Sequence, residues 1–158
     1  MNETAPVEMA PVEMAPQEFA TQEWPFYWLT RATGLYLSQL ERALKTAGLD
    51  VARYRVLMCV RPGQARSITE IADLAIVKIP TMMKIIQRMQ AEGLVQAAPR
   101  AGDGRFTDVS LTQAGMAARD TAWKMAHALY EQVFSGDAAP DRLTVNRELA
   151  RIVAHLEG

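Results

Sequence analysis

Residues 67–92 constrain the fold most, because two short helical patterns follow one another there with only about three residues between them. The first begins with Ser-Ile-Thr-Glu at 67–70, a capping-box pattern ahead of an apolar run, and predicts a helix that ends near Ala75. The second, residues 79–92, has apolar side chains at three- and four-residue spacing and carries Pro80 in its first turn, where proline is tolerated. Two helices this short and this close predict a helix-turn-helix.

A β-hairpin is predicted directly after these helices. Residues 94–98 and 106–111 are strand-length runs, and the Gly-containing tip 100–105 joins them. An ordinary solvated turn is one interpretation, since Asp-Gly is a common turn dipeptide. After a helix-turn-helix, the hairpin is more typical of a wing over the DNA minor groove, where an inserted arginine is favoured electrostatically. We expect Arg105 to make that contact, with Asp103 paired to an arginine and fixing the shape of the wing.

Helical patterns flank this central part. Residues 26–47 carry one wide apolar stripe, and Asp50 is placed to cap a second helix over 51–60. A long helix is expected over 112–134, and a last one from about 140 to 156. The predicted fold class is mainly α with a small β-hairpin wing.

Residues 1–24 form a degenerate pentapeptide repeat, APVEM, APVEM, APQEF, ATQEW, with five acidic residues and no Lys or Arg. Its prolines forbid a continuous helix. One interpretation is a disordered, extended tail. The other is an arm that docks its spaced Met9, Met14, Phe19 and Trp24 on the body or on a partner subunit.

Composition bounds the class of protein. Of the 158 residues 49% are hydrophobic and 22% charged, as in a typical globular domain, and no run approaches the length of a membrane span. The acidic, proline-rich N-terminus resembles no signal peptide, and the chain has a single cysteine, so we expect a cytoplasmic protein. Outside the tail, basic residues outnumber acidic ones although the net charge is −1, which suits a nucleic-acid partner.

Three segments resemble the MarR family of bacterial transcriptional regulators, and the resemblance covers about residues 26–156. They are LDVARYRVLMCV (49–60), SITEIADLAIVKIPTMMKIIQRMQAEGLV (67–95) and DGRFTDVSLTQAG (103–115). The resemblance implies a winged helix-turn-helix with interlocking terminal dimerisation helices, and a homodimer that represses transcription from a palindromic operator. The implied division is a tail (1–24), a dimerisation helix (25–48), a DNA-binding lobe (49–111) and further dimerisation helices (112–158).

Double-stranded DNA is therefore the expected partner, bound by the second helix of the motif and by the wing. The candidate DNA-binding residues are Ser67, Lys78, Ile79, Thr81, Met82, Lys84, Arg88, Arg100, Asp103 and Arg105. Two departures from the family pattern stand out. Lys78 replaces the usual Ser, Thr or Asp cap, and Ala97 replaces a common arginine.

Regulators of this family often respond to small aromatic or phenolic acids. Residues expected to line such a cleft are Trp28, Arg31, Tyr54, Met58, Trp123 and His127. An arginine among aromatic side chains suits an aromatic carboxylate. The alternative is that these side chains are core or dimer contacts.

Other functions are less well supported. A thiol sensor through Cys59 would lack a second cysteine, and an apolar setting makes a thiol inert. His127 and His155 form no recognisable metal-ligand set, and neither metal nor cofactor is expected. No phosphate loop, paired carboxylates or Ser/His/Asp pattern indicates an enzyme. A winged helix that binds protein instead of DNA remains an alternative.

Overall fold

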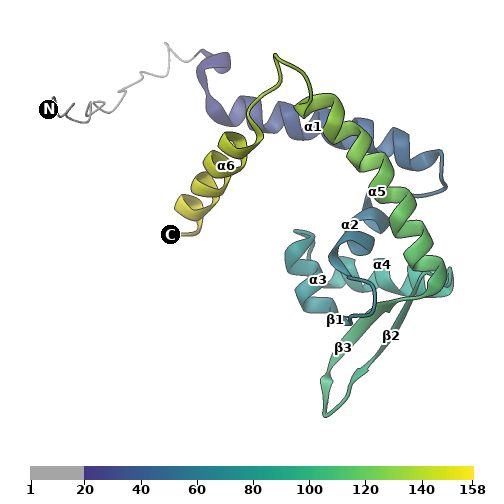
Figure 1. The fold of residues 1–158 in the computed structure, drawn as a ribbon. Coiled ribbons are helices and arrows are strands. Elements are labelled where there is room, and N and C mark those ends of the chain that lie inside the picture. The colour runs from purple at the N-terminus through teal and green to yellow at the C-terminus, as the bar shows by residue number, and fades with distance from the viewer. Residues whose placement is uncertain (1–19) are drawn as a thin grey trace, which may run out of the picture. The chain divides into compact units, whose positions relative to one another are not determined.

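The structure is a computed structural model that describes residues 20–158. The described residues fall into two units that divide between residues 36 and 37. In the first unit, a 3-10 turn at Thr21–Glu23 precedes helix α1, which spans Pro25–Lys45 and continues into the second unit (Figure 1). The interpretations of the tail fall mostly on residues 1–19, which lie outside the described part.

The second unit contains the predicted winged helix-turn-helix, and the predicted order of elements is confirmed. After the end of α1, the elements are α2 (Val51–Cys59), β1 (Arg66–Ser67), α3 (Ile68–Leu74), α4 (Ile79–Ala91), β2 (Val95–Arg100), β3 (Asp103–Leu111), α5 (Gln113–Phe134) and α6 (Arg142–Glu157). The four-part domain division inferred from the sequence remains a prediction.

The sheet differs from the prediction in two ways. A third strand, β1, pairs with β3 through Arg66 and Val109, and its two residues are too few to produce an alternating pattern in the sequence. The hairpin is also longer than expected. Pairing continues to Arg100 and Asp103, so the loop is only Ala101 and Gly102, and a φ of +83° at Gly102 closes it. Arg105 consequently lies on β3 and not in a flexible tip.

Side-chain caps explain where the helices begin. The carboxylate of Asp50 accepts from the Arg53 backbone N–H at 2.7 Å and starts α2. At the start of α3, Ser67 Oγ accepts from the Glu70 N–H at 3.2 Å while Glu70 Oε2 accepts from the Ser67 N–H at 2.9 Å. Both halves of the predicted capping box are therefore present. At the start of α5, Thr112 Oγ1 accepts from the Gly115 N–H at 3.0 Å, a cap without the reciprocal half.

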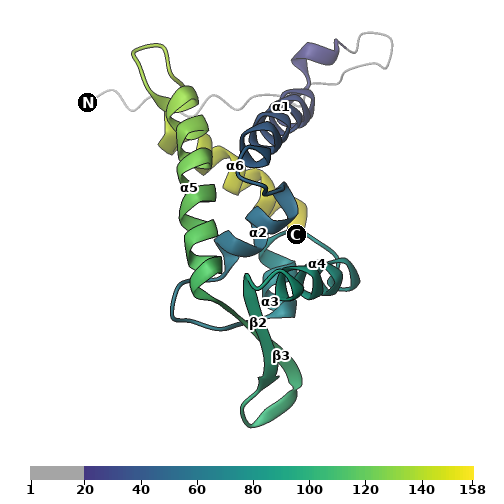
Figure 2. The ribbon, with the colours of Figure 1, turned by 90° about the vertical axis from the view of Figure 1, so that its right-hand side faces the viewer.

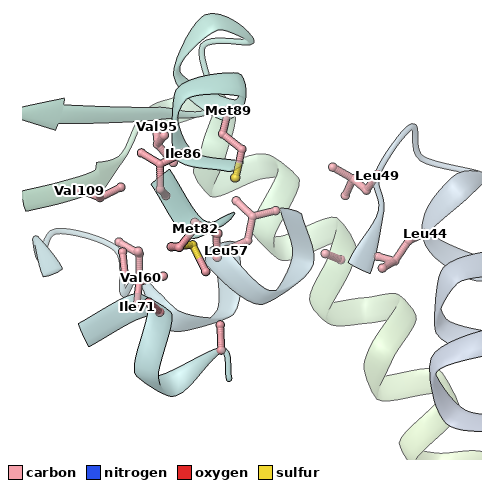
Figure 3. Close-up of a cluster of buried hydrophobic side chains, with 14 of the residues drawn as sticks. Leu44, Leu49, Leu57, Val60, Ile71, Met82, Ile86, Met89, Val95 and Val109 are labelled. Atoms are coloured by element: carbon pink, nitrogen blue, oxygen red, sulfur yellow. The ribbon is translucent and has the colours of Figure 1, made fainter. Parts of the chain in front are cut away.

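The core of the second unit holds α4 with one face inward. Figure 3 shows side chains from α2, α3, α4 and the sheet meeting in one cluster. Its fully buried members include Leu57, Ile71, Met82, Ile86, Met89 and Val109. Because three of these come from α4 at three- and four-residue spacing, the opposite face of α4 must point outward.

Ile76, in the turn between α3 and α4, has a left-handed backbone with φ of +54°. This conformation is unfavourable for a β-branched residue, and at 91% exposure the side chain gains almost no burial in return. Ile76→Asn is expected to raise the free energy of unfolding by about 1 kcal/mol, since asparagine tolerates the left-handed region. Urea titration of the two proteins measures the difference. Equal or lower stability of the variant would show that the turn is not strained.

Candidate nucleic-acid interface

Helix α4 presents most of the predicted recognition residues to solvent. Lys78, Ile79, Thr81, Lys84 and Arg88 are all exposed. Lys78 is the N-cap residue of α4, and its side chain makes no capping hydrogen bond. The helix thus begins without a polar cap, as expected from the departure noted in the sequence.

Two of the predicted DNA-contact side chains are buried. Met82 is fully buried in the core beneath α4, and Ser67 is only 3% exposed, with its hydroxyl engaged in the capping box. Neither side chain reaches the outer surface. The helical phase of Met82 is that of Ile86 and Met89, which placed it on the inner face already in the sequence.

Met83 and Gln87 are exposed on α4 and were not among the predicted contacts. Met83 lies one helical turn after Ile79, and Gln87 lies three residues after Lys84, so the same periodicity that marks the predicted residues marks these two as well.

The wing holds Arg105 through Asp103. Nε and Nη2 of Arg105 each donate to the Asp103 carboxylate at 2.9 Å, and the Arg105 backbone N–H donates to it at 3.2 Å. These bonds lower the pKa of the Asp103 carboxyl below its ordinary value. The predicted pairing of Asp103 with an arginine is confirmed. The Arg105 side chain remains 86% exposed and open to a further partner.

Arg100 is bound within the protein. Its Nε and Nη2 donate to Asp108 at 2.8 to 3.1 Å, Nη2 lies 3.6 Å from Glu70 Oε2, and the guanidinium lies 5.0 Å from the centre of the Phe106 ring. Because Glu70 belongs to α3, these contacts link the wing to the helix-turn-helix. The geometry favours a role in positioning the wing over a direct contact with DNA.

Arg88, near the C-terminal end of α4, is also paired within the protein. Its Nη2 donates to Asp50 Oδ2 at 3.2 Å, although the side chain stays 48% exposed. Arg53 bonds both Asp50 and Glu92, and the Glu92 carboxylate raises the pKa of the Arg53 guanidinium. The four charged groups join the N-terminus of α2 to the C-terminal end of α4 and fix the position of that helix.

The arrangement is suited to a polyanion. Residues 76–91 contain three basic side chains, Lys78, Lys84 and Arg88, and no acidic one. Figures 1 and 2 show α3, α4 and the β2–β3 hairpin together at one end of α5. A helix of this size fits the major groove of DNA, and a hairpin beside it reaches the next groove or the backbone.

The predicted ligand-binding residues are divided between the two units, and their grouping into one site remains a prediction. The rings of Trp123 and His127 lie tilted to one another along α5 with centres 5.5 Å apart, while Tyr54 and Met58 are half-buried against the core. Trp28 and Arg31 are exposed in the first unit. A hollow of about 290 Å³ lies at the end of the α1–α2 loop with Arg53 and Glu92 in its wall, and in the described chain none of the four candidates of the second unit lines it.

Cys59 has the environment of a core residue and not that of a reactive thiol. Cys59 is half-buried against the core, and burial raises the pKa of its thiol, against the opposing effect of the Arg66 charge. A raised pKa lowers the thiolate fraction on which redox sensing depends. Among residues 20–158, no group of three or more His, Cys, Asp or Glu side chains is placed to hold a metal ion.

A helix-turn-helix with a hairpin wing and a cationic outer face defines a winged-helix transcription factor. No family model matches the chain. It is 38% identical over 133 residues to the HTH-type transcriptional repressor IacR of Pseudomonas putida, a match that covers 84% of this chain and 80% of IacR. The chain belongs to the MarR family of transcriptional regulators, whose members are not enzymes.

Solved structures agree with this fold. A MarR-family regulator from Silicibacter pomeroyi superposes with a TM-score of 0.76 at 25% identity, over 90% of this chain and 96% of that one. BpsR of Bordetella bronchiseptica, whose DNA binding is regulated by 6-hydroxynicotinic acid, gives 0.75 at 21% identity, over 85% and 96%. Across residues 20–158 no helix combines the length and hydropathy that crossing a bilayer requires.

Proposed function

We propose that the protein is a homodimeric, cytoplasmic repressor that binds a palindromic operator through α4 and the wing. The observation that carries this proposal is the exposed row Lys78, Thr81, Lys84 and Arg88 on α4, together with the exposed Arg105 on the wing. Arg105 would enter the minor groove or meet a phosphate, and Asp103 would hold it in place. Arg100 serves as a positioning residue.

The proposed dimer is supported by apolar surface on the terminal helices. In the described residues, α6 has no buried side chain, yet Val145, Leu149, Ile152, Val153 and Leu156 form one stripe along it. Exposed Trp28, Leu35 and Tyr36 on α1 add further apolar surface. Surface of this kind is rare on monomers, and a second copy of the chain related by two-fold symmetry would cover it.

A small aromatic acid is the proposed effector. The support is a row of rings on α5, in which His127 lies 5.5 Å from Trp123 and 5.7 Å from Tyr130, and the regulation of BpsR by an aromatic acid. Such a ligand would act by favouring a spacing of the two DNA-binding lobes that does not fit the operator.

Selection of bound duplexes from a random library tests the function. The wild type is expected to enrich a palindrome, and Arg105→Ala is expected to bind it about tenfold more weakly with less A·T preference beside the core site. The matched control is Arg151→Ala, which removes one exposed arginine from α6 and should leave affinity unchanged.

Equal affinity of wild type and Arg105→Ala would remove the wing from the proposed interface. A protein-binding winged helix would enrich no duplex at any salt concentration. DNA binding, by contrast, should weaken steeply with salt, with a slope of about −0.9 per phosphate neutralised.

A further inference from the structure

The outward face of α4 has two chemically different edges. Thr81, Lys84 and Arg88 follow one another at three- and four-residue spacing and form a polar, cationic edge. Ile79 and Met83, four residues apart, form an apolar edge. In the described part of the chain these two side chains remain 46% and 45% exposed, although Met82 and Ile86 on the same helix are buried almost completely.

The chemistry of the apolar edge restricts which group of a binding partner can contact it favourably. Phosphate groups are suited to contact with Lys84 and Arg88, but a hydrated anion would gain nothing from contact with Ile79 or Met83. In the major groove the apolar group is the C5-methyl of thymine. Both edges lie on one helix of this cationic surface. DNA whose phosphates contact the basic edge would therefore place its bases beside Ile79 and Met83.

Gln87 adds a second, polar feature. It is exposed and lies four residues after Met83 and three after Lys84, so it stands between the two edges. A glutamine amide hydrogen-bonds N6 and N7 of adenine as a bidentate pair. An A·T pair carries both the thymine methyl and this adenine edge.

We propose that the apolar edge, Ile79 and Met83, contacts thymine methyl groups and that Gln87 reads an adjacent adenine. Each half-site of the operator then contains A·T pairs opposite the first turns of α4. This inference rests on the proposed DNA-binding function and specifies which bases the recognition helix reads.

Replacing thymine by uracil in the DNA tests the methyl contact, because uracil lacks only the C5-methyl group. The duplex is the one that wild-type protein enriches from a random library, and the full chain is titrated against it by fluorescence anisotropy. Substitution at a contacted position should lower wild-type affinity about fourfold, the effect of burying one methyl-sized group.

Matched variants assign the contact to the side chain. Met83→Ala should bind the thymine and uracil duplexes equally, whereas Met83→Leu, which keeps an apolar side chain, should retain the loss on uracil. Gln87→Ala should likewise be insensitive to 7-deazaadenine at the adenine that the wild type requires. Melting curves that match the wild type confirm that these surface variants fold.

Four outcomes would overturn the inference. If the enriched duplexes lack A·T pairs in the half-sites, or if uracil leaves wild-type affinity unchanged, the apolar edge does not face thymine and the DNA-binding function still stands. If Met83→Ala and Ile79→Ala both still lose affinity on uracil, other residues make the contact. If no duplex is enriched at low salt, the proposed function fails as well, and a protein partner for the apolar edge becomes the better explanation.

Discussion

Gly115→Ala is expected to lower the free energy of unfolding by about 3 kcal/mol. A Cβ at this position would lie 1.9 Å from the backbone oxygen of Leu94, which no real contact permits. The same carbonyl accepts from the Thr112 N–H and hydroxyl, both at 3.1 Å, so it cannot move without breaking the bonds that join α5 to the lobe. Guanidinium chloride unfolding of both proteins measures the loss.

Gly104→Ala is the matched control for this prediction. A Cβ at Gly104 meets nothing within 4 Å, and its backbone has no left-handed φ, so the substitution should change stability by less than about 0.5 kcal/mol. If Gly115→Ala is as stable as this control, α5 does not approach Leu94 as closely as the structure has it.

Val153→Glu is expected to raise the dissociation constant of the proposed dimer at least a hundredfold. Val153 lies within the apolar stripe of α6 and is 51% exposed in the single chain. A second copy packed on this stripe would bury the new carboxylate without a partner, at a cost of about 3 kcal/mol or more. Sedimentation equilibrium measures the change, and operator affinity should fall with it because two linked lobes bind far more tightly than one.

Ala154→Glu provides the comparison for the dimer. It adds the same charge to the next residue, about 100° around the helix and away from the stripe, and should leave the dimer intact. A wild-type protein that sediments as a monomer would contradict the proposed assembly, and equal dissociation constants for the two variants would place the interface elsewhere.

The sequence determined the local elements because their signals lie within a few residues of one another. The capping box at Ser67 and Glu70, the cap at Asp50 and the periodicity of residues 79–92 act within one or two helical turns, and each produced the predicted helix. The pairing of Asp103 with an arginine is equally local, since Arg105 is two residues away. Together these elements were sufficient for the fold class.

Contacts between distant residues could not be predicted in this way. The sequence predicts Arg100 only as a DNA contact on the wing, but its position beside Glu70 and Asp108 depends on how the hairpin packs on α3. Arg88 reaches Asp50 across 38 residues of chain. Strand β1 exists only because β3 lies beside it to supply hydrogen-bonding partners.

The candidate DNA-contact residues on α4 also differ in how far they are buried. Helical phase places Met82 on the inner face of α4 and Met83 outside it, and packing against α2 and the sheet buries Met82 while Met83 stays at the surface. The sequence by itself therefore determined which segments become helices and hairpin, through caps and periodicity that act locally. Only the tertiary structure decided which charges are already paired and that β1 joins the sheet, because both depend on neighbours that are distant in sequence.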